Sequence, residues 1–596
     1  MCGIAGFFGD GDRSAVPAML STLRHRGPDD LHIVSGERFA IGATRLSIID
    51  VEGGRQPLTN EDGAVVAAQN GELYNFPTMR PLLLARGHRL ETRTDTELLP
   101  HLWEDVGEKL PEYVDGMFAL AVWDGPQRVG LLARDRMGKK PLYYWLRGGA
   151  LYFASELKAL LAIPGFSRRL NLEALHHYLG YKHVPHPHTI FEGVRMLPPA
   201  HRLVYRPGAE PIVSRYWALS FAPGSKSVSD EPAVIDELLT RMRRAVGRRL
   251  MSDVPIGFFL SGGIDSSLTT ALAAEVAPSR IKTFTLTYAG EATTIGKEQD
   301  RRWARWVADR YDTDHHEETI AIEDYPSSLR KILRAFDEPF AGVVSTYFLA
   351  QRMAQHVKVA VAGDGADELF GSYLSHRLAA GAQSMPPGMD GPDWEWRAKL
   401  LVMSDEEKVE LYSPDVRAAL AGVSTREHVR SAFECLTARD PLNRVLEAEW
   451  RGMLPDQVLT FVDRLSMSHS LEVRSAFLDT EVVEYVASLP GSLKIRNGET
   501  KYILKQSAAR YFPEDMIRRP KEGFLMPITQ WVMGGLQPWV RATLAPERLA
   551  LHGLFEPDRV GAMVDRVYAP GADYRTVNKA LALVIFQEWY EMYLGR

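Results

Sequence analysis

The run Phe-Phe-Leu-Ser-Gly-Gly-Ile-Asp-Ser-Ser at residues 258–267 constrains the fold more than any other feature of the chain. It indicates an apolar strand, a glycine turn and the start of a helix. Two adjacent glycines let backbone N–H groups approach an anion closely, and a helix N-terminus adds a favourable partial charge. The run therefore predicts a phosphate-binding loop, although it lacks the Gly-Lys-Ser/Thr ending of a Walker A motif.

The pattern around this loop predicts a parallel sheet. From about residue 230, apolar strand-like runs alternate with helical segments, and the chain becomes mostly helical after about residue 380. This alternation is typical of an α/β doubly wound sheet covered on both faces, followed here by a helical C-terminal part. Our expected strands are residues 256–260, 282–288 and 358–361.

The beginning of the chain has a different pattern. Its first ~215 residues carry short strands separated by turns, with one helical segment at residues 94–106, which indicates a sheet-rich α+β region. The Ser/Pro/Gly-rich segment at residues 221–230 is the best candidate for a linker. We therefore expect two domains, residues 1–215 and 230–596.

Composition excludes several classes of protein. Lys plus Arg is 70 and Asp plus Glu is 76, so the net charge is −6, and neither nucleic acid nor a membrane surface is an expected partner. Two cysteines, Cys2 and Cys435, provide no disulfide framework, which favours a reducing compartment. No run approaches the roughly 18 apolar residues of a membrane span, and no targeting segment is visible. We expect a cytoplasmic protein.

Cys2 is a candidate nucleophile. Removal of Met1 would put the thiol and the α-amino group on one residue. An α-amino group has a pKa of about 7.7–8.0, so it can act as a general base near neutral pH. Taken alone, Cys2 is more simply interpreted as a small residue at a frayed end.

Other polar residues suit an amino acid that carries an amide. Asn70 and Gly71 follow a predicted strand and offer an amide and a backbone N–H as an oxyanion hole. Arg45 can bind an α-carboxylate bidentately, and Asp95 can accept from an α-ammonium group. Together with Cys2, they predict a site that hydrolyses glutamine.

These segments resemble the class II glutamine amidotransferase domain, an N-terminal nucleophile (Ntn) αββα sandwich, as found in the asparagine synthetase family. The matching runs are residues 2–4, 24–29, 45–48, 70–75, 115–119, 134–142 and 154–158, together with Asp95. The resemblance implies that Cys2 is the nucleophile and that Asn70 and Gly71 form the oxyanion hole. It implies glutamine-binding residues Arg45, Leu46, Ser47, Ile48, Asn70, Gly71, Glu72 and Asp95. Thr44 and Gln69 stand where the family often has His and Phe, and we expect them to tune the pocket.

The second half resembles the family's ATP-pyrophosphatase synthetase domain. Its phosphate loop, a second acidic loop at residues 362–371, and blocks at residues 463–474, 501–505 and 519–524 occur in the family's order. The implied ATP-binding residues are Leu260, Ser261, Gly262, Gly263, Asp265, Ser266, Leu286, Ala362, Gly363 and Lys521. Asp265 and Asp367 are well placed to hold Mg²⁺ against the departing pyrophosphate.

The resemblance implies a reaction between the two sites. A carboxylate attacks the α-phosphorus of ATP and becomes an acyl-adenylate, while Lys501 neutralises developing charge. Ammonia released at Cys2 reaches the adenylate through an interdomain tunnel. Asp364 joins the expected catalytic set, although asparagine synthetases of the best-known type carry Glu there. Members of the family often form dimers.

The acceptor carboxylate stays open. Aspartate is the first hypothesis, and Asp364, residues 289–294 and Ser475-Ala476 depart from the best-known asparagine synthetases, which favours a paralogue with another acceptor as the alternative. A ring-closing relative of the β-lactam synthetase type is less well supported, because that class typically lacks the cysteine. A non-catalytic scaffold would need neither site. The loop histidines His183, His186 and His188 are interpreted as neutral residues and not as zinc ligands.

Overall fold

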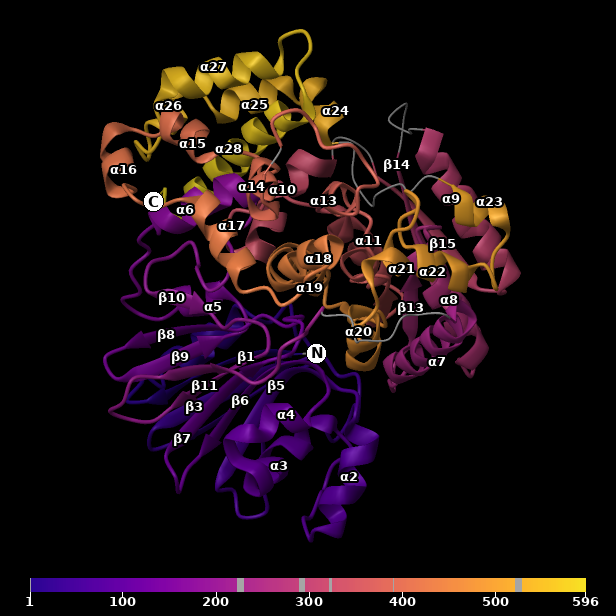
Figure 1. Cartoon of the computed structure of the whole chain (residues 1–596). Coiled ribbons are helices and arrows are strands. Elements are labelled where there is room, and N and C mark those ends of the chain that lie inside the picture. The colour runs from indigo at the N-terminus through magenta and orange to yellow at the C-terminus, as the bar shows by residue number, and fades with distance from the viewer. Residues whose placement is uncertain are drawn as a thin grey trace.

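The computed structural model describes residues 2–221, 230–288, 295–320, 324–389, 391–519 and 528–595. Two parts follow one another along the chain and pack together (Figure 1). We call residues 2–215 the sandwich and residues 231–593 the parallel-sheet part. Most of the predicted linker lies outside the described residues.

The sandwich contains two six-stranded antiparallel sheets. The first has the order β10 (Val194–Met196), β8 (Tyr143–Arg147), β9 (Ala150–Ala154), β1 (Cys2–Gly9), β3 (Phe39–Arg45), β2 (Asp30–Gly36). The second has the order β12 (Ile212–Arg215), β11 (His201–Tyr205), β7 (Val129–Arg134), β6 (Gly116–Asp124), β5 (Val65–Leu73), β4 (Leu58–Thr59).

Helices cover both outer faces of the sandwich. Helices α1 (Ala15–Ser21) and α5 (Leu157–Leu161) pack on the first sheet, and α3 (Leu98–Val106) packs on the second. Strand β1 is buried along its whole length because Ile4 and Phe8 enter the core between the sheets while Ala5 and Phe7 face the helices. The αββα prediction is confirmed.

The parallel-sheet part is built on five strands. Their order is β15 (Asp314–Ile320), β14 (Lys282–Tyr288), β13 (Ile256–Phe259), β16 (Val359–Ala362), β17 (Glu472–Ser475), and all neighbours are parallel. Helices α7 (Glu231–Arg249), α8 (Ile264–Val276) and α9 (Ile295–Arg310) cover one face, and α11 (Ser345–Met353) and α19 (Leu459–Met467) cover the other. The doubly wound prediction is confirmed.

The strand order predicts where a ligand binds. Strand β13 lies in the middle of the sheet, and the chain leaves it towards β14 on one side and returns to β16 on the other. Connections that diverge from neighbouring strands open a crevice at their carboxyl ends. The glycine loop follows β13 and the acidic loop follows β16, so both predicted phosphate-site loops meet at this crevice.

The C-terminal helices close the molecule at the top of Figure 1. The longest, α28 (Tyr574–Tyr593), packs against α6 (Leu172–Tyr181) and α10 (Asp324–Phe336), and the Tyr178 hydroxyl donates to the Ala582 carbonyl at 2.8 Å. One apolar cluster therefore joins the two parts. The helices between α11 and α28 include α12 (Ala366–Phe370), α13 (Leu374–Ala379), α14 (Asp393–Lys399), α17 (Thr425–Glu434), α18 (Pro441–Arg451), α20 (Thr480–Ala487), α22 (Tyr502–Ala508) and α27 (Pro557–Val567).

Some elements differ from the sequence prediction. The sandwich also contains α1, α2 (Phe76–Ala85), α4 (Leu110–Tyr113), α5 and α6, so the prediction of a single helix there is wrong. Strands β15 and β17 were not predicted, because both are mostly polar runs and β17 has only four residues. These strands lie at the sheet edges, where pairing with a neighbour decides the conformation.

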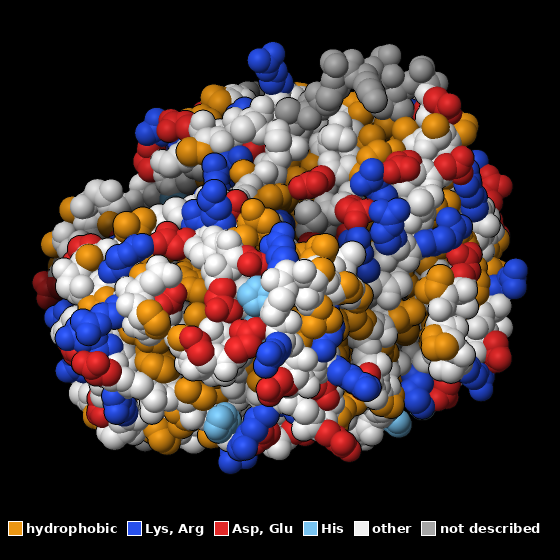
Figure 2. Space-filling view, turned by 90° about the horizontal axis from the view of Figure 1, so that it is seen from below, with side chains coloured by type: hydrophobic (Ala, Val, Ile, Leu, Met, Phe, Trp, Pro, Cys, Tyr) orange, Lys and Arg blue, Asp and Glu red, His pale blue; other side chains and the backbone are white. Residues whose placement is uncertain are grey.

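Figure 2 shows that positive and negative side chains are interspersed on the face of the molecule drawn there. Among the described residues, every helix is too short or too polar to cross a membrane.

Candidate functional site

Cys2 begins β1 at the boundary between the two parts and pairs with Arg45 of β3. Its side chain is buried, and the Gln56 Nε2 atom lies 3.5 Å from the sulfur. Burial raises the pKa of the Cys2 thiol. A thiol in this environment needs a base to generate the nucleophilic thiolate.

The predicted oxyanion residues lie beside Cys2. The Asn70 Nδ2 atom donates to the Cys2 carbonyl at 2.8 Å while its Oδ1 accepts from Arg26 Nη2 at 3.2 Å. Gly71 has φ +153°, and a Cβ there would lie only 1.9 Å from the Met117 carbonyl oxygen. Glycine is therefore required at this position, and Asn70 is oriented from both ends of its amide.

Arg45 and Asp95 are buried and are held by uncharged groups. The Arg45 guanidinium donates to the carbonyl oxygens of residues 49–51 at 2.5–3.2 Å, which leaves Nε–H and one Nη1 hydrogen of its five donors. Asp95 accepts from Leu73 N at 2.7 Å and from Gln69 Nε2 at 2.8 Å. Burial raises the pKa of Asp95. The family departure at Gln69 thus supplies a donor that positions Asp95.

Residues 46–48 connect the pocket to the parallel-sheet part. Ser47 N donates to Asp29 Oδ2 at 2.8 Å, and Ile48 O accepts from Asp253 N at 2.9 Å. Leu46 and Ile48 are buried in one apolar cluster with residues of β16 and α19. The segment is therefore positioned by contacts across the boundary as well as by β3.

Glu72 is directed across the boundary. Its Oε1 atom lies 3.5 Å from the Arg474 guanidinium of β17, which also pairs with Glu472 at 2.6 Å. Burial, together with the negative charge of Glu472, raises the pKa of Glu72 well above its usual range. The predicted glutamine-binding residue Glu72 is thus linked to the other part through Arg474.

The glycine loop has a preformed shape. Ser266 Oγ lies 3.2 Å from Ser261 N and 3.1 Å from Ser261 Oγ. Gly262 has φ +74°, and a Cβ there would lie 2.2 Å from the Asp300 carbonyl oxygen. Arg519 donates to the Gly262 carbonyl at 2.7 Å and pairs with Asp300 at 2.7 Å.

The remaining predicted nucleotide residues frame the same crevice. Gly263 caps α8, Leu260 is fully buried, Leu286 lies on β14, and Ala362 ends β16. Gly363 packs directly against Asp265, because a Cβ on this glycine would lie 3.0 Å from the Asp265 Cβ. The predicted residue Lys521 lies outside the described residues.

Lys501 connects the glycine loop after β13 to the acidic loop after β16. Its Nζ lies 2.5 Å from Asp265 Oδ2 and 2.6 Å from Asp367 Oδ1. Burial opposes the charge on Lys501, but the two carboxylates outweigh it and raise the pKa of the lysine. Asp265 Oδ1 is buried and makes no hydrogen bond to any described residue. An oxygen of this kind fits a cation ligand, so the carboxylates suit Mg²⁺.

Asp364 lies beside a small cavity between the two parts. The cavity has a volume of about 20 Å³ and is lined by Lys139, Lys140, Asp364, Leu459, Val462, Asp463, Val473, Arg474, Ser475 and Leu478. Burial, with Asp367 and Asp265 nearby, raises the pKa of Asp364 to about 7. Burial, with Arg249 nearby, lowers the pKa of Lys139 to about 7. The cavity has room for one molecule the size of water or ammonia.

Buried ion pairs connect Cys2 to this cavity. Arg26 Nε donates to the Cys2 carbonyl at 3.3 Å, and its Nη1 and Nη2 donate to Asp463 at 2.9 and 3.1 Å. Lys140 Nζ pairs with the same Asp463 at 3.1 Å. A continuous set of polar contacts therefore runs from the cysteine to residues that line the cavity.

Comparison with known proteins agrees with this arrangement. Residues 237–591 match the model of the family described as asparagine synthase, and residues 1–217 match the model of the glutamine amidotransferase domain. The chain belongs to the asparagine synthase family. It is 30% identical to asparagine synthetase (glutamine-hydrolysing) 1 of Bacillus subtilis, with 99% of this chain and 97% of that protein covered.

Other relatives span similar lengths. Asparagine synthetase (glutamine-hydrolysing) 3 of Bacillus subtilis is 30% identical, with 95% of this chain and 93% of that protein covered. The amidase chyE of Penicillium rubens is 25% identical, with 95% and 93% covered. As a member of the asparagine synthase family, the protein is a glutamine-dependent ligase of the asparagine synthetase type, and its family implies ATP as a substrate.

Several residues of this asparagine synthase family protein were not assigned a role from the sequence. Gln56 contacts the thiol, and Arg26 and Asp463 bridge the two parts, although both stand in sequence runs that match the family. Arg474 and Lys139 also stand in matching runs, and they too contact the boundary or line the cavity without having been assigned a role. The matching runs were the available signal, but their contacts join residues more than 300 positions apart.

Proposed function

We propose that the protein takes ammonia from glutamine and transfers it to an adenylated carboxylate, with aspartate as the acceptor and asparagine, AMP and pyrophosphate as products. Residues 1–215 would form the glutaminase domain and residues 230–596 the synthetase domain. The observation that carries the proposal is the set of contacts from Cys2 through Arg26 and Asp463 to the cavity beside Asp364. It links two sites that would otherwise act independently.

In the glutaminase step, the Cys2 sulfur attacks the side-chain amide carbon of glutamine. The α-amino group of Cys2, available once Met1 is removed, accepts the thiol proton. Asn70 and the Gly71 N–H stabilise the oxyanion, and Asp95 binds the substrate ammonium group. The α-amino group passes this proton to the amide nitrogen, which leaves as ammonia, and water then hydrolyses the resulting thioester to glutamate and the free thiol. The two unused Arg45 donors suit the substrate carboxylate.

In the synthetase step, an acceptor carboxylate oxygen attacks the α-phosphorus of ATP and pyrophosphate leaves. The Ser261–Ser266 loop would bind phosphate oxygens, and Lys501 would stabilise the charge that develops. Asp265 and Asp367 would hold Mg²⁺, which supplies charge neutralisation for the departing pyrophosphate. The acidic and glycine loops meet at the carboxyl ends of β13 and β16, which supports this assignment.

In the transfer step, ammonia attacks the acyl carbon of the adenylate and AMP leaves. The nitrogen must then lose a proton. Asp364 faces the cavity with an unbonded, buried Oδ2 atom and a pKa raised to about 7, which suits a general base. We assign this proton transfer to Asp364.

A second acceptor class is the alternative. Asp364 is one methylene shorter than the Glu of the best-known asparagine synthetases, so the space beside the acyl group differs. The similarity to a protein named amidase chyE is consistent with family members that amidate other carboxylates. The two-site reaction is the same in both cases.

The test is an isotope experiment on the purified protein. Glutamine labelled with ¹⁵N in its side-chain amide is supplied with Mg-ATP and aspartate, and mass spectrometry follows AMP, glutamate and asparagine. We expect labelled asparagine and AMP in equal amounts. Labelled asparagine that disappears in Cys2→Ala and returns with free ammonia would support both steps.

Glutamate release without asparagine, and without AMP that depends on aspartate, would contradict aspartate as the acceptor. Other carboxylates, such as peptides and sugar acids, would then be screened by AMP release. Absence of glutamate release from glutamine by the wild-type protein would contradict the whole proposal.

A further inference from the structure

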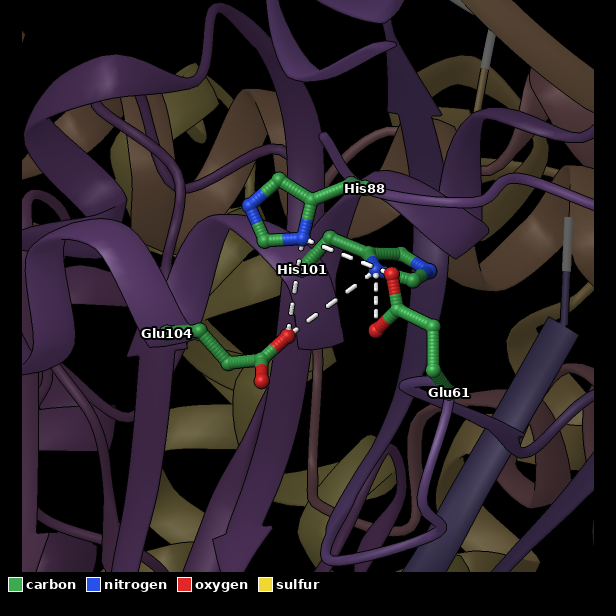
Figure 3. Close-up of side chains that lie close together, drawn as sticks. All are labelled: Glu61, His88, His101 and Glu104. Carbon is green, nitrogen blue, oxygen red and sulfur yellow. Dashed lines mark ion pairs between the residues drawn. The ribbon is translucent and has the colours of Figure 1, made fainter. Parts of the chain in front are cut away.

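A cluster of two histidines and two glutamates lies on the sandwich (Figure 3). Glu61 follows β4, His88 follows α2, and His101 and Glu104 lie one turn apart on α3. Figure 3 shows all four side chains pointing toward a common centre. Three separate segments of the chain thus bring metal-ligand side chains together.

One ligand atom from each of the four residues lies within 4.8 Å of the other three, and the nitrogen–oxygen distances in the cluster are close to those of a zinc site. His101 Nδ1 lies 3.3 Å from Glu61 Oε2, and His88 Nδ1 lies 3.6 Å from Glu61 Oε1. Glu104 Oε2 lies 3.7 Å from His88 Nδ1 and 3.9 Å from His101 Nδ1. Ligands about 2.1 Å from a tetrahedral zinc ion are about 3.4 Å apart, so small side-chain rotations are enough to coordinate one.

The ring of His101 supplies an independent indication of a ligand. Its side chain is only 1% exposed, and its Nδ1 atom makes no hydrogen bond to any described residue. A buried nitrogen without a hydrogen bond costs free energy, and such groups are rare in folded proteins. This nitrogen points into the cluster, where a cation would satisfy it.

Neighbouring groups hold the ligands in orientation. The Nε2 atom of His88 lies 3.4 Å from Asp105 Oδ1, which favours metal binding through Nδ1. Asn60 Nδ2 donates to Glu104 Oε1 at 3.0 Å, and the Arg89 N–H donates to Glu61 Oε1 at 2.8 Å. In both glutamates the Oε2 atom is left for a metal ion.

We propose that Glu61, His88, His101 and Glu104 bind one divalent transition-metal ion, with Zn²⁺ as the preferred ion. Two imidazole nitrogens and two carboxylate oxygens suit zinc, and the two negative charges balance the ion. Four protein ligands make this a closed, structural site. The ion ties the segment after β4 to α3, and these elements adjoin Gln56 and Asp95.

The test measures zinc binding to the full-length protein after removal of metal with a chelator. Titration with Zn²⁺ against a fluorescent chelator gives stoichiometry and affinity, and Co²⁺ reports the coordination geometry through its visible spectrum. We expect one tight equivalent and the intense bands of four-coordinate Co²⁺. His101→Gln and Glu104→Gln should each weaken binding at least tenfold, and Asp105→Asn about 10–100-fold.

Two variants serve as controls. His32→Gln changes a histidine of the same sandwich outside the cluster, and Cys2→Ala removes a cysteine of the sandwich, whose thiolate could also bind zinc; both variants should keep the tight equivalent. Added Zn²⁺ should raise the Tm of the wild-type protein and leave that of Glu104→Gln unchanged. This variant alters a partly exposed side chain, and circular dichroism verifies its fold.

The proposal is overturned if the wild-type protein binds no tight equivalent. It is also overturned if folded His101→Gln and Glu104→Gln keep the wild-type affinity, or if Cys2→Ala removes the tight equivalent. Ammonia-dependent synthesis should be unchanged in the cluster variants, because none of these side chains lies in the parallel-sheet part.

Discussion

The two proposed sites hold their charged side chains in different ways. In the sandwich, Arg45 is held by backbone carbonyls, and Asp95 by a backbone N–H and the Gln69 amide. In the parallel-sheet part, Asp265 and Asp367 both pair with the cation of Lys501, and Asp367 also accepts from the Ser372 hydroxyl. The first site is organised by uncharged dipoles and the second by opposite charges.

This difference has a physical consequence for substitution. When several neutral groups hydrogen-bond one charged side chain, removal of one group leaves the others in place. The expected loss of stabilisation is then that of a single hydrogen bond. When one lysine pairs with two half-buried carboxylates, its removal leaves two like charges close together with no cation between them. We therefore expect unequal responses in the two sites, and the following variants test that expectation.

The largest effect is expected for Cys2→Ala. Loss of the nucleophile should lower glutamine-dependent synthesis on the order of 10⁴-fold or more, while ammonia-dependent synthesis continues. Initial rates with glutamine and with ammonium chloride measure the two activities, and Cys435→Ala, at an exposed cysteine, is the control. An equal fall of both activities would show that Cys2 supports the fold and not the glutaminase step.

Lys501→Gln should give the next largest effect. Synthesis with either nitrogen source should fall by about 10²–10³-fold, because the developing charge loses its cation. Glutamate release should persist. The matched control is Lys505→Gln, one turn later on α22, because Lys505 Nζ pairs with Glu499 at 3.3 Å and not with Asp265 or Asp367. Wild-type synthesis by folded Lys501→Gln would contradict the charge-based organisation of the site.

Asp364→Asn tests the pH dependence of stability. The pKa of Asp364 is raised from 3.8 to about 7, so the native state holds a proton that the unfolded state loses between these values. Wild-type stability due to this group is therefore present below about pH 4 and lost as pH rises to about 7. Relative to wild type, the variant should gain stability over that range, by on the order of a few kcal/mol.

Thermal unfolding between pH 4 and pH 8 measures this difference. Asp558→Asn, at an exposed position of α27, should follow the wild-type curve. A constant offset between Asp364→Asn and wild type across the whole range would mean that Asp364 is charged throughout.

The smallest effect is expected for Gln69→Leu. Asp95 keeps the Leu73 N–H but loses the Gln69 amide, so the KM for glutamine should rise about tenfold, the equivalent of about 1.4 kcal/mol. Ammonia-dependent synthesis should not change. Gln127→Leu, at an exposed position, is the control. A complete loss of glutaminase activity would mean that the neutral donors do not act redundantly.

Local sequence predicted the central strands well and the edge strands poorly. Strand β14 has the predicted bounds, because Phe284 and Leu286 alternate with threonines and pack in one apolar cluster with residues of α11. Strands β15 and β17 are polar and gain their conformation from pairing with β14 and β16.

The predicted site residues also divide by the range of their contacts. The Ser-Gly-Gly loop was recognisable because its shape depends on φ angles and hydroxyls within six residues. The orientation of Glu72 toward Arg474 could not be predicted from the sequence, because their pairing depends on how two distant segments pack. The glutamine-binding role of Glu72 stays a prediction.

Sequence alone determined the family, the two sheet types and the candidate reactive residues, because periodicity and short motifs depend on neighbours in the chain. Tertiary structure alone decided that Lys501 joins the glycine loop to the acidic loop and that Arg26 pairs with Asp463. It also decided that the side chains of Glu61, His88, His101 and Glu104 form a metal-ligand cluster. Such contacts depend on where strands and helices end in space, and the free energy of a buried charge depends on every group around it.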